Sequence, residues 1–151
     1  MSSELELELS KQFKAAQEKY IYFLLAVAAS AIGYAITQAK VEPLQYIHIS
    51  YGLSILFWAL SFYSGLQFSE YAISQTFQNW NYLTFKRELK SYPPDKATVL
   101  FTEFKKLFDK THNNQNSKKE FWGKLQSRSL LLGAIFYIAW HIARMINATG
   151  V

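Results

Sequence analysis

Three histidines supply the only imidazoles of the chain, and His48 and His141 are the two whose surroundings could support chemistry. Each lies in an apolar stretch, within about two helical turns of what we expect to be the same end of two helices. Two imidazoles at one depth on neighbouring helices could ligate a haem iron. The alternative is that each bonds to a serine, a carbonyl or the lipid headgroup layer. Nothing else in the sequence supports a haem, so we expect no cofactor. His112 lies in a polar stretch and is expected to be solvated.

Tyr137, His141 and Arg144 recur at helical spacing in the last apolar stretch. An ionisable side chain inside a membrane is costly, and it therefore marks a function or a partner. In one interpretation Arg144 pairs with Glu42, the only acid expected on the same side of the membrane. In the other, His141 and Arg144 surround a pore that favours anions or is gated. The two interpretations are compatible in an oligomer.

Clustered basic residues between the second and third apolar stretches could recognise an anion. The candidates are Lys86, Arg87, Lys90, Lys105 and Lys106. The anion could be the inner leaflet, a nucleic acid or a nucleotide messenger. The first three would lie ~27 Å or more beyond Phe68 along a helix, too far for simple headgroup attraction. We therefore expect them to sense an anionic ligand.

Signals for catalysis are missing. The chain has no cysteine, which excludes thiolate chemistry and Cys-ligated metals. It has no glycine-rich phosphate loop, and no Ser-His-Asp arrangement that could sit in a soluble pocket. We predict that the protein is not an enzyme and holds no metal.

Three apolar windows carry almost no charge in a chain that is 50% hydrophobic overall. They are Tyr20–Thr37, Leu44–Phe68 and Ser129–Ile146. Each is close to the ~20 residues that cross a bilayer as a helix. We predict an all-α protein with three transmembrane helices. The second window continues without a proline to Tyr92, so its helix should extend into water.

Small and hydroxylated residues recur along the first two windows. Ala26, Ser30, Gly33 and Thr37 form a strip of the kind that lets transmembrane helices approach closely. Another stripe comprises Ser50, Ser54, Ser61 and Ser64. Packing between helices is the more common role of a serine stripe, and pore lining is the rarer one. We keep Ser50, Ser54 and Ser61, with Tyr137, His141 and Arg144, as candidates for lining a pore.

Beyond Phe68 the long helix is apolar on two opposed sides. One side carries Leu66, Ile73, Phe77 and Trp80, and the other Tyr71, Tyr82, Phe85 and Leu89. A helix that is apolar on both sides must be covered on both sides. This chain can supply one cover, and we expect another subunit to supply the second.

Pro93 and Pro94 should end the long helix, and Asp95 should cap a new helix that runs to about Lys110. The polar composition of Thr111–Asn116 predicts a turn. Ser117 and Glu120 have the spacing of a capping box, which predicts that the last helix begins near Lys118.

The chain divides into three predicted regions. Residues 1–68 form an N-terminal amphipathic helix, uncleaved, and a two-helix transmembrane hairpin. Residues 69–128 form a basic water-exposed helical region, and residues 129–151 form the third transmembrane helix. Eleven of the sixteen Lys and Arg residues fall in 69–128. By the positive-inside rule, that region and the N-terminus are cytoplasmic and the C-terminus is outside.

The first 92 residues resemble the small helical membrane effectors of bacterial anti-phage systems, in particular the SLATT type. The resemblance is one of architecture: an N-terminal helix, the hairpin of Tyr20–Thr37 and Leu44–Phe68, and a following helix at Ser69–Tyr92. It implies a pore in the inner membrane controlled by a partner nucleotidyltransferase and its messenger. The third apolar window departs from the two-crossing pattern.

We therefore expect a homo-oligomeric membrane pore gated through its basic cytoplasmic helices. Two alternatives stay open. One is a non-conducting membrane anchor that recruits a soluble enzyme, and the other is a haem-bearing electron carrier.

Overall fold

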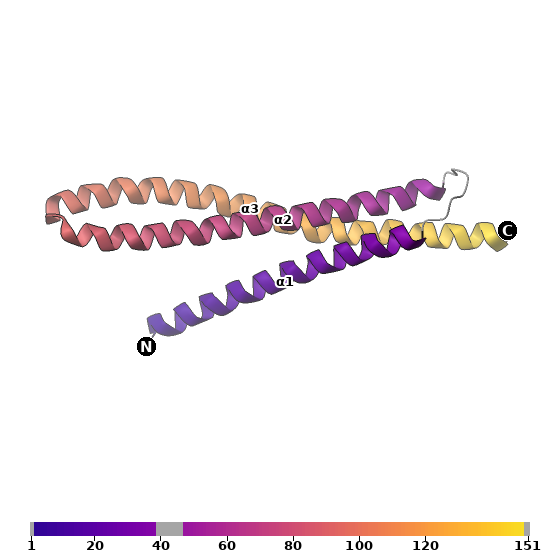
Figure 1. Ribbon diagram of the computed structural model, residues 1–151, viewed down its shortest axis with the longest axis horizontal. Coiled ribbons are helices and arrows are strands. Elements are labelled where there is room, and N and C mark those ends of the chain that lie inside the picture. The colour runs from indigo at the N-terminus through magenta and orange to yellow at the C-terminus, as the bar shows by residue number, and fades with distance from the viewer. Residues whose placement is uncertain (1, 39–46, 150–151) are drawn as a thin grey trace. The chain divides into compact units, whose positions relative to one another are not determined.

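A computed structural model describes residues 2–38 and 47–149 of the chain, and these residues form three long α-helices (Figure 1). Helix α1 spans Ser2–Gln38, α2 spans Ile47–Glu88 and α3 spans Pro94–Thr149; a 3₁₀ turn, η1, at Leu89–Ser91 follows α2. The described residues contain no β-strand. The fold is all-α, as predicted. Each helix contains a window that is long and apolar enough to cross a membrane.

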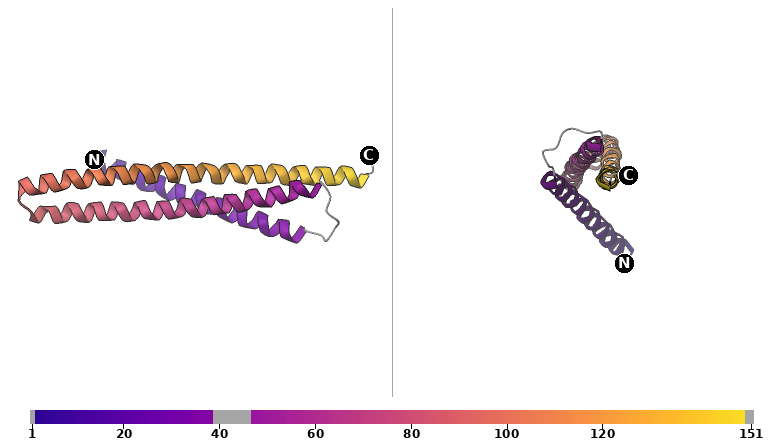
Figure 2. Two further views of the ribbon diagram at one scale, coloured as in Figure 1. Left: turned by 90° about the horizontal axis from the view of Figure 1, so that it is seen from above. Right: turned by 90° about the vertical axis from the view of Figure 1, so that its right-hand side faces the viewer.

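The chain divides into two compact units. Unit 1 comprises Met1–Leu66 and Gly123–Val151, and unit 2 comprises Gln67–Trp122. Unit 1 therefore contains α1, the first part of α2 and the last part of α3. Unit 2 contains the rest of α2, η1 and the rest of α3, which turn back on each other as an antiparallel hairpin (Figure 2).

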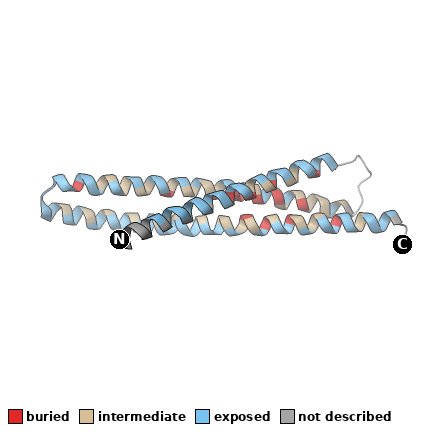
Figure 3. Cartoon of the chain, turned by 90° about the horizontal axis from the view of Figure 1, so that it is seen from below, coloured by how far each residue is buried: buried red, intermediate tan, exposed pale blue. Residues whose placement is uncertain are grey.

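Unit 1 buries residues from all three helices where they meet (Figure 3). Helix α1 contributes Ile21, Leu24, Ala28 and Ala35; α2 contributes Ser54, Trp58, Ser61 and Ser64; α3 contributes Gln126, Ser129 and Trp140. Serines and alanines dominate this list because they let helix backbones approach closely. The contacts are therefore those of a tightly packed helical bundle.

Helix α1 packs through a different face from the one we predicted. Its strip of small residues, from Ala26 to Thr37, is exposed along its length, and a Cβ added to Gly33 would meet nothing within 4 Å. At 100° per residue the strip lies opposite the buried positions Ile21, Leu24 and Ala28. That opposite face buries the large side chains of Ile21 and Leu24, which remove more apolar area from solvent than the small-residue strip could. Its other buried residues, Ala28 and Ala35, are small enough to let the helices approach closely.

Aromatic side chains hold the two helices of unit 2 together. Tyr82 of α2 lies against Phe101, Phe104 and Phe108 of α3, with ring centroids 6.2, 6.1 and 4.8 Å away. Phe85 stacks on Phe104 at 4.1 Å. One of the two predicted apolar sides of α2 is thus covered by this chain, as expected.

The predicted turn at Thr111–Asn116 is wrong, because α3 continues through it without interruption. His112 in this stretch stacks on Phe108 at 5.4 Å and is half-buried, so it is not simply solvated. Farther from the hairpin tip, Gln75 accepts a bond from Lys119 Nζ at 2.7 Å. Contacts with α2 on both sides of the polar run keep it helical.

Two predicted caps are corrected as well. The Ser117 hydroxyl donates to the Asn113 carbonyl at 3.1 Å, a bond between successive turns of one helix, so Ser117 is not an N-cap. Asp95 lies inside the first turn of α3 because the helix begins at Pro94. Proline suits that first position, where an amide proton would have no helical partner.

Candidate functional site

A buried polar layer lies at the helix crossing in unit 1, around Gln126 of α3. The Gln126 side chain is fully buried, and its Nε2 donates to the Ile21 carbonyl of α1 at 3.4 Å. The Gln126 backbone carbonyl accepts a 2.8 Å bond from the Ser61 hydroxyl of α2. One residue therefore bonds to both other helices. Its Oε1 is buried without a partner, which leaves part of its hydrogen-bonding capacity unused.

Two glycines make this crossing possible. A Cβ added to Gly65 of α2 would lie 2.7 Å from Leu25 Cδ2 and 2.9 Å from Gln126 Cδ. A Cβ added to Gly133 of α3 would overlap the indole of Trp58, with Cγ at 3.0 Å. Any larger residue at either position would have to displace a buried side chain. These close contacts fix how α2 and α3 pack within unit 1.

The serine stripe lies mostly inside this packing. Ser54 and Ser61 have no exposed surface, and neither does Ser64. The Ser54 and Ser64 hydroxyls donate to carbonyls of their own helix, at Tyr51 and Leu60, both at 2.7 Å. Helix packing accounts for these three residues, and within the chain their hydroxyls are not available to line a pore. Ser50 is half-buried.

An aromatic cluster surrounds Tyr137, another of the pore candidates. The Tyr137 ring lies 6.2 Å from Tyr34, 5.4 Å from Trp58 and 5.5 Å from Trp140. The Tyr51 ring lies 4.8 Å from that of Trp140, tilted by 43°, and the Tyr51 hydroxyl donates to the Ala35 carbonyl. Tyr137 is half-buried, and with Trp140 it contacts aromatic rings of both α1 and α2 in unit 1.

The other two pore candidates lie at the edge of this cluster. The Arg144 guanidinium lies 5.5 Å from the centre of the Trp140 ring, within the range of a cation–π contact. The His141 side chain is exposed, and its ring is 6.2 Å from that of Trp140. The proposed pairing of Arg144 with Glu42 involves a residue outside the described ones.

No group of three or more His, Cys, Asp or Glu side chains within residues 2–38 and 47–149 is arranged to hold a metal ion. His48 is half-buried, whereas His141 is exposed.

The basic residues proposed to sense an anion lie on the surface of unit 2. Lys86, Arg87 and Lys90 come from the end of α2 and from η1, and Lys105 and Lys106 from α3; all five are exposed. Unit 2 has two open grooves, and their lining residues include none of these five basic side chains. All five therefore remain candidates for binding an anion at the surface of the hairpin.

The second apolar side of α2 is uncovered in unit 2. Ile73, Phe77 and Trp80, which we call the exposed seam, are 67%, 60% and 60% exposed. The Phe77 and Trp80 rings stack on each other with centroids 6.0 Å apart. The exposed seam is therefore an apolar patch on a segment otherwise rich in polar residues.

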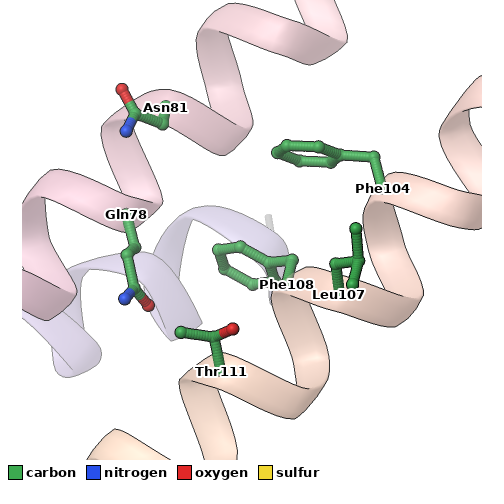
Figure 4. Close-up of a pocket in the computed structure, with 6 residues that line it drawn as sticks. All are labelled: Gln78, Asn81, Phe104, Leu107, Phe108 and Thr111. Carbon is green, nitrogen blue, oxygen red and sulfur yellow. The ribbon is translucent and has the colours of Figure 1, made fainter.

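A groove beside the seam was not foreseen from the sequence. Its volume is about 220 Å³, and it is lined by Gln78 and Asn81 of α2 and by Phe104, Leu107, Phe108 and Thr111 of α3 (Figure 4). Gln78 extends toward Thr111, whereas the Asn81 amide points away from α3. The groove arises only where two helices meet, so no pattern within either helix could reveal it.

Comparisons of the chain with protein-family models, with curated proteins and with solved structures found no match.

Proposed function

We propose that the protein is a homo-oligomeric membrane effector whose copies associate through unit 2 and enclose an ion-conducting pore. The exposed seam is the observation that carries the proposal. Phe and Trp side chains each contribute ~150–250 Å² when buried, so three uncovered apolar side chains in water are costly at ~25 cal/mol per Å². A second copy supplies the simplest cover because it brings a matching surface at the same level.

The membrane-spanning part supports association for a separate reason. His141 is exposed on α3 within the third apolar window, next to Arg144. An imidazole side chain that faces hydrocarbon is costly. A neighbouring subunit or a water-filled path would provide it with hydrogen-bond partners. We propose His141, Arg144 and Ser50 as pore residues. Ser54 and Ser61 are fully buried within the chain, and the half-buried Tyr137 packs against three aromatic rings, so these three are weaker candidates.

The trigger would act on the basic surface of the hairpin. We place unit 2 and the N-terminus in the cytoplasm of a bacterial cell and the C-terminus outside the inner membrane, because lysines and arginines favour the cytoplasmic side. An anionic ligand, such as a nucleotide or oligonucleotide, or a partner nucleotidyltransferase would bind Lys86, Arg87 and Lys90. Opening of the pore would then depolarise the cell.

The mass of the detergent-extracted particle and ion flux through liposomes test this function together. We expect a particle of several subunits, and flux that appears or rises when a nucleotide is added. A particle of monomer mass would reject the proposal. Single-channel steps of uniform size would support a closed ring over leakage.

A second candidate is a non-conducting membrane anchor that recruits a soluble enzyme. It is favoured by the burial of Ser54 and Ser61, which removes two of the hydroxyls that a pore through the bundle would need. The groove lined by Gln78, Leu107 and Phe108, which we call the hairpin groove, would then receive part of the recruited enzyme. An oligomer that passes no ions with any nucleotide, but retains a soluble protein on the membrane, would favour the anchor.

A further inference from the structure

We propose that the exposed seam of one copy inserts into the hairpin groove of the next copy, head to tail around a ring. This inference rests on the proposed association of copies and says how it is made. The seam supplies the stacked pair Phe77 and Trp80, and the groove is the one bounded by Gln78 and Phe108. Both surfaces belong to unit 2.

Symmetry places these two surfaces at the same level. Copies in one membrane share one orientation and are related by rotation about an axis along the membrane normal. Equivalent residues of neighbouring copies then lie at equal heights. On α2, Phe77 and Trp80 alternate along the sequence with Gln78 and Asn81 of the groove, so the seam of one copy stands level with the groove of its neighbour.

The groove has the size and lining for an aromatic side chain. Its volume of about 220 Å³ exceeds the ~150 Å³ of an apolar cavity that holds benzene. Phe104, Leu107 and Phe108 give it an apolar floor, and Leu107 is 67% exposed in the single copy. A ring from the neighbour would cover Leu107 and lose its own contact with water at the same time.

The groove and the seam also have complementary hydrogen-bonding groups. The Oε1 atom of Gln78 is buried without a partner in the single copy. The Trp80 indole is a donor only. After a small rotation of the Gln78 amide, the indole N–H of the neighbour would satisfy this acceptor, as buried acceptors usually require.

A back-to-back dimer, in which two seams face each other, is the competing arrangement. Glu70 and Arg87 lie on the same side of α2 as the seam and both are exposed. In a parallel back-to-back pair, Glu70 would face Glu70 of the other copy and Arg87 would face Arg87, so like charges would meet at both ends. Head-to-tail contact avoids this repulsion because the seam meets a different surface.

Cysteine cross-linking separates the two arrangements, and the absence of native cysteines makes the background clean. Phe77→Cys and Thr111→Cys chains, differently tagged, are co-expressed at full length in membranes and treated with a mild oxidant. We expect a disulfide between the two kinds of chain, and at least tenfold less within either kind alone. The matched control is Asp109→Cys, which lies on the same turn as Thr111 but about 200° around the helix, and we expect it not to cross-link with Phe77→Cys.

Each other outcome overturns the inference. Cross-linking of Phe77→Cys with itself would establish the back-to-back dimer. Cross-linking of Asp109→Cys as strong as that of Thr111→Cys would show random collision. As a measurement without disulfides, we expect Leu107→Trp, which fills the groove, to shift the wild-type oligomer to monomers. An unchanged oligomer would leave the proposed association intact but reject the groove as its site, whereas a monomeric wild type would reject the association itself.

Discussion

Replacing Gly65 with alanine tests the packing at the helix crossing of unit 1. An added Cβ would lie 2.7 Å from Leu25 Cδ2 and 2.9 Å from Gln126 Cδ, against an ordinary contact of 3.4–4 Å. Overpacking of this kind costs ~1–3 kcal/mol. Gly52→Ala is the matched control because a Cβ there meets nothing within 4 Å, and it should gain the ~0.5–1 kcal/mol by which alanine exceeds glycine in a helix.

Thermal unfolding in detergent, followed by circular dichroism, measures the difference. Both alanine variants gain the same helix propensity, so the difference between them is the ~1–3 kcal/mol of overpacking. At ~2–4 °C per kcal/mol for a chain of this size, Gly65→Ala should unfold ~2–12 °C below Gly52→Ala. Part of the loss should disappear when Gln126→Ala is added, with a coupling of ~0.5–3 kcal/mol, because the amide that the Cβ meets is then gone. Equal midpoints for the two alanine variants would refute the account of this crossing.

Three further predictions concern the hairpin, the serine stripe and the aromatic cluster around Tyr137. Phe85→Ala should lower the free energy of unfolding by up to ~3 kcal/mol, measured by thermal unfolding, because it removes the stack of Phe85 on Phe104. Phe77→Ala should cost little in the single chain because its ring is exposed. Equal losses would contradict the assignment of the two sides of α2. Ser61→Ala should lower the free energy of unfolding by ~0.6 kcal/mol, the average for a hydrogen bond between transmembrane helices, and should leave ion flux through liposomes unchanged. A tenfold drop in flux would instead place this hydroxyl in a pore. Arg144→Gln should lose ~0.5–2 kcal/mol of contact with Trp140 and lower the ratio of chloride to potassium flux through liposomes, and a ratio equal to that of the wild type would remove Arg144 from the pore.

The helices could be predicted from the sequence because their signals are local. Long apolar windows and the Pro93-Pro94 pair place the three helices and the end of the hairpin. The two apolar sides of α2 could likewise be predicted from 100° periodicity, and one of them is covered by α3 as expected. Each of these inferences needs only residues within one helix or one turn.

The errors arose where contacts between helices decide the outcome. The run Thr111–Asn116 has the composition of a turn, but these polar residues are only mildly unfavourable in a helix, and packing against α2 overrides that preference. Likewise, the exposed strip around Gly33 has the same small-residue pattern as a buried one. Only the position of the neighbouring helices distinguishes the two cases, and that position is not a property of either sequence segment.

If copies associate through the exposed seam as proposed, the membrane lowers the strength that their contact must have. Insertion into a bilayer confines every copy to a plane and aligns it, so most of the entropy that association normally costs is lost before two copies meet. A contact too weak to be detected between free hairpins in solution can then hold neighbours together at the surface. Assembly would respond to the number of copies per area of membrane, and expression level alone could switch it on.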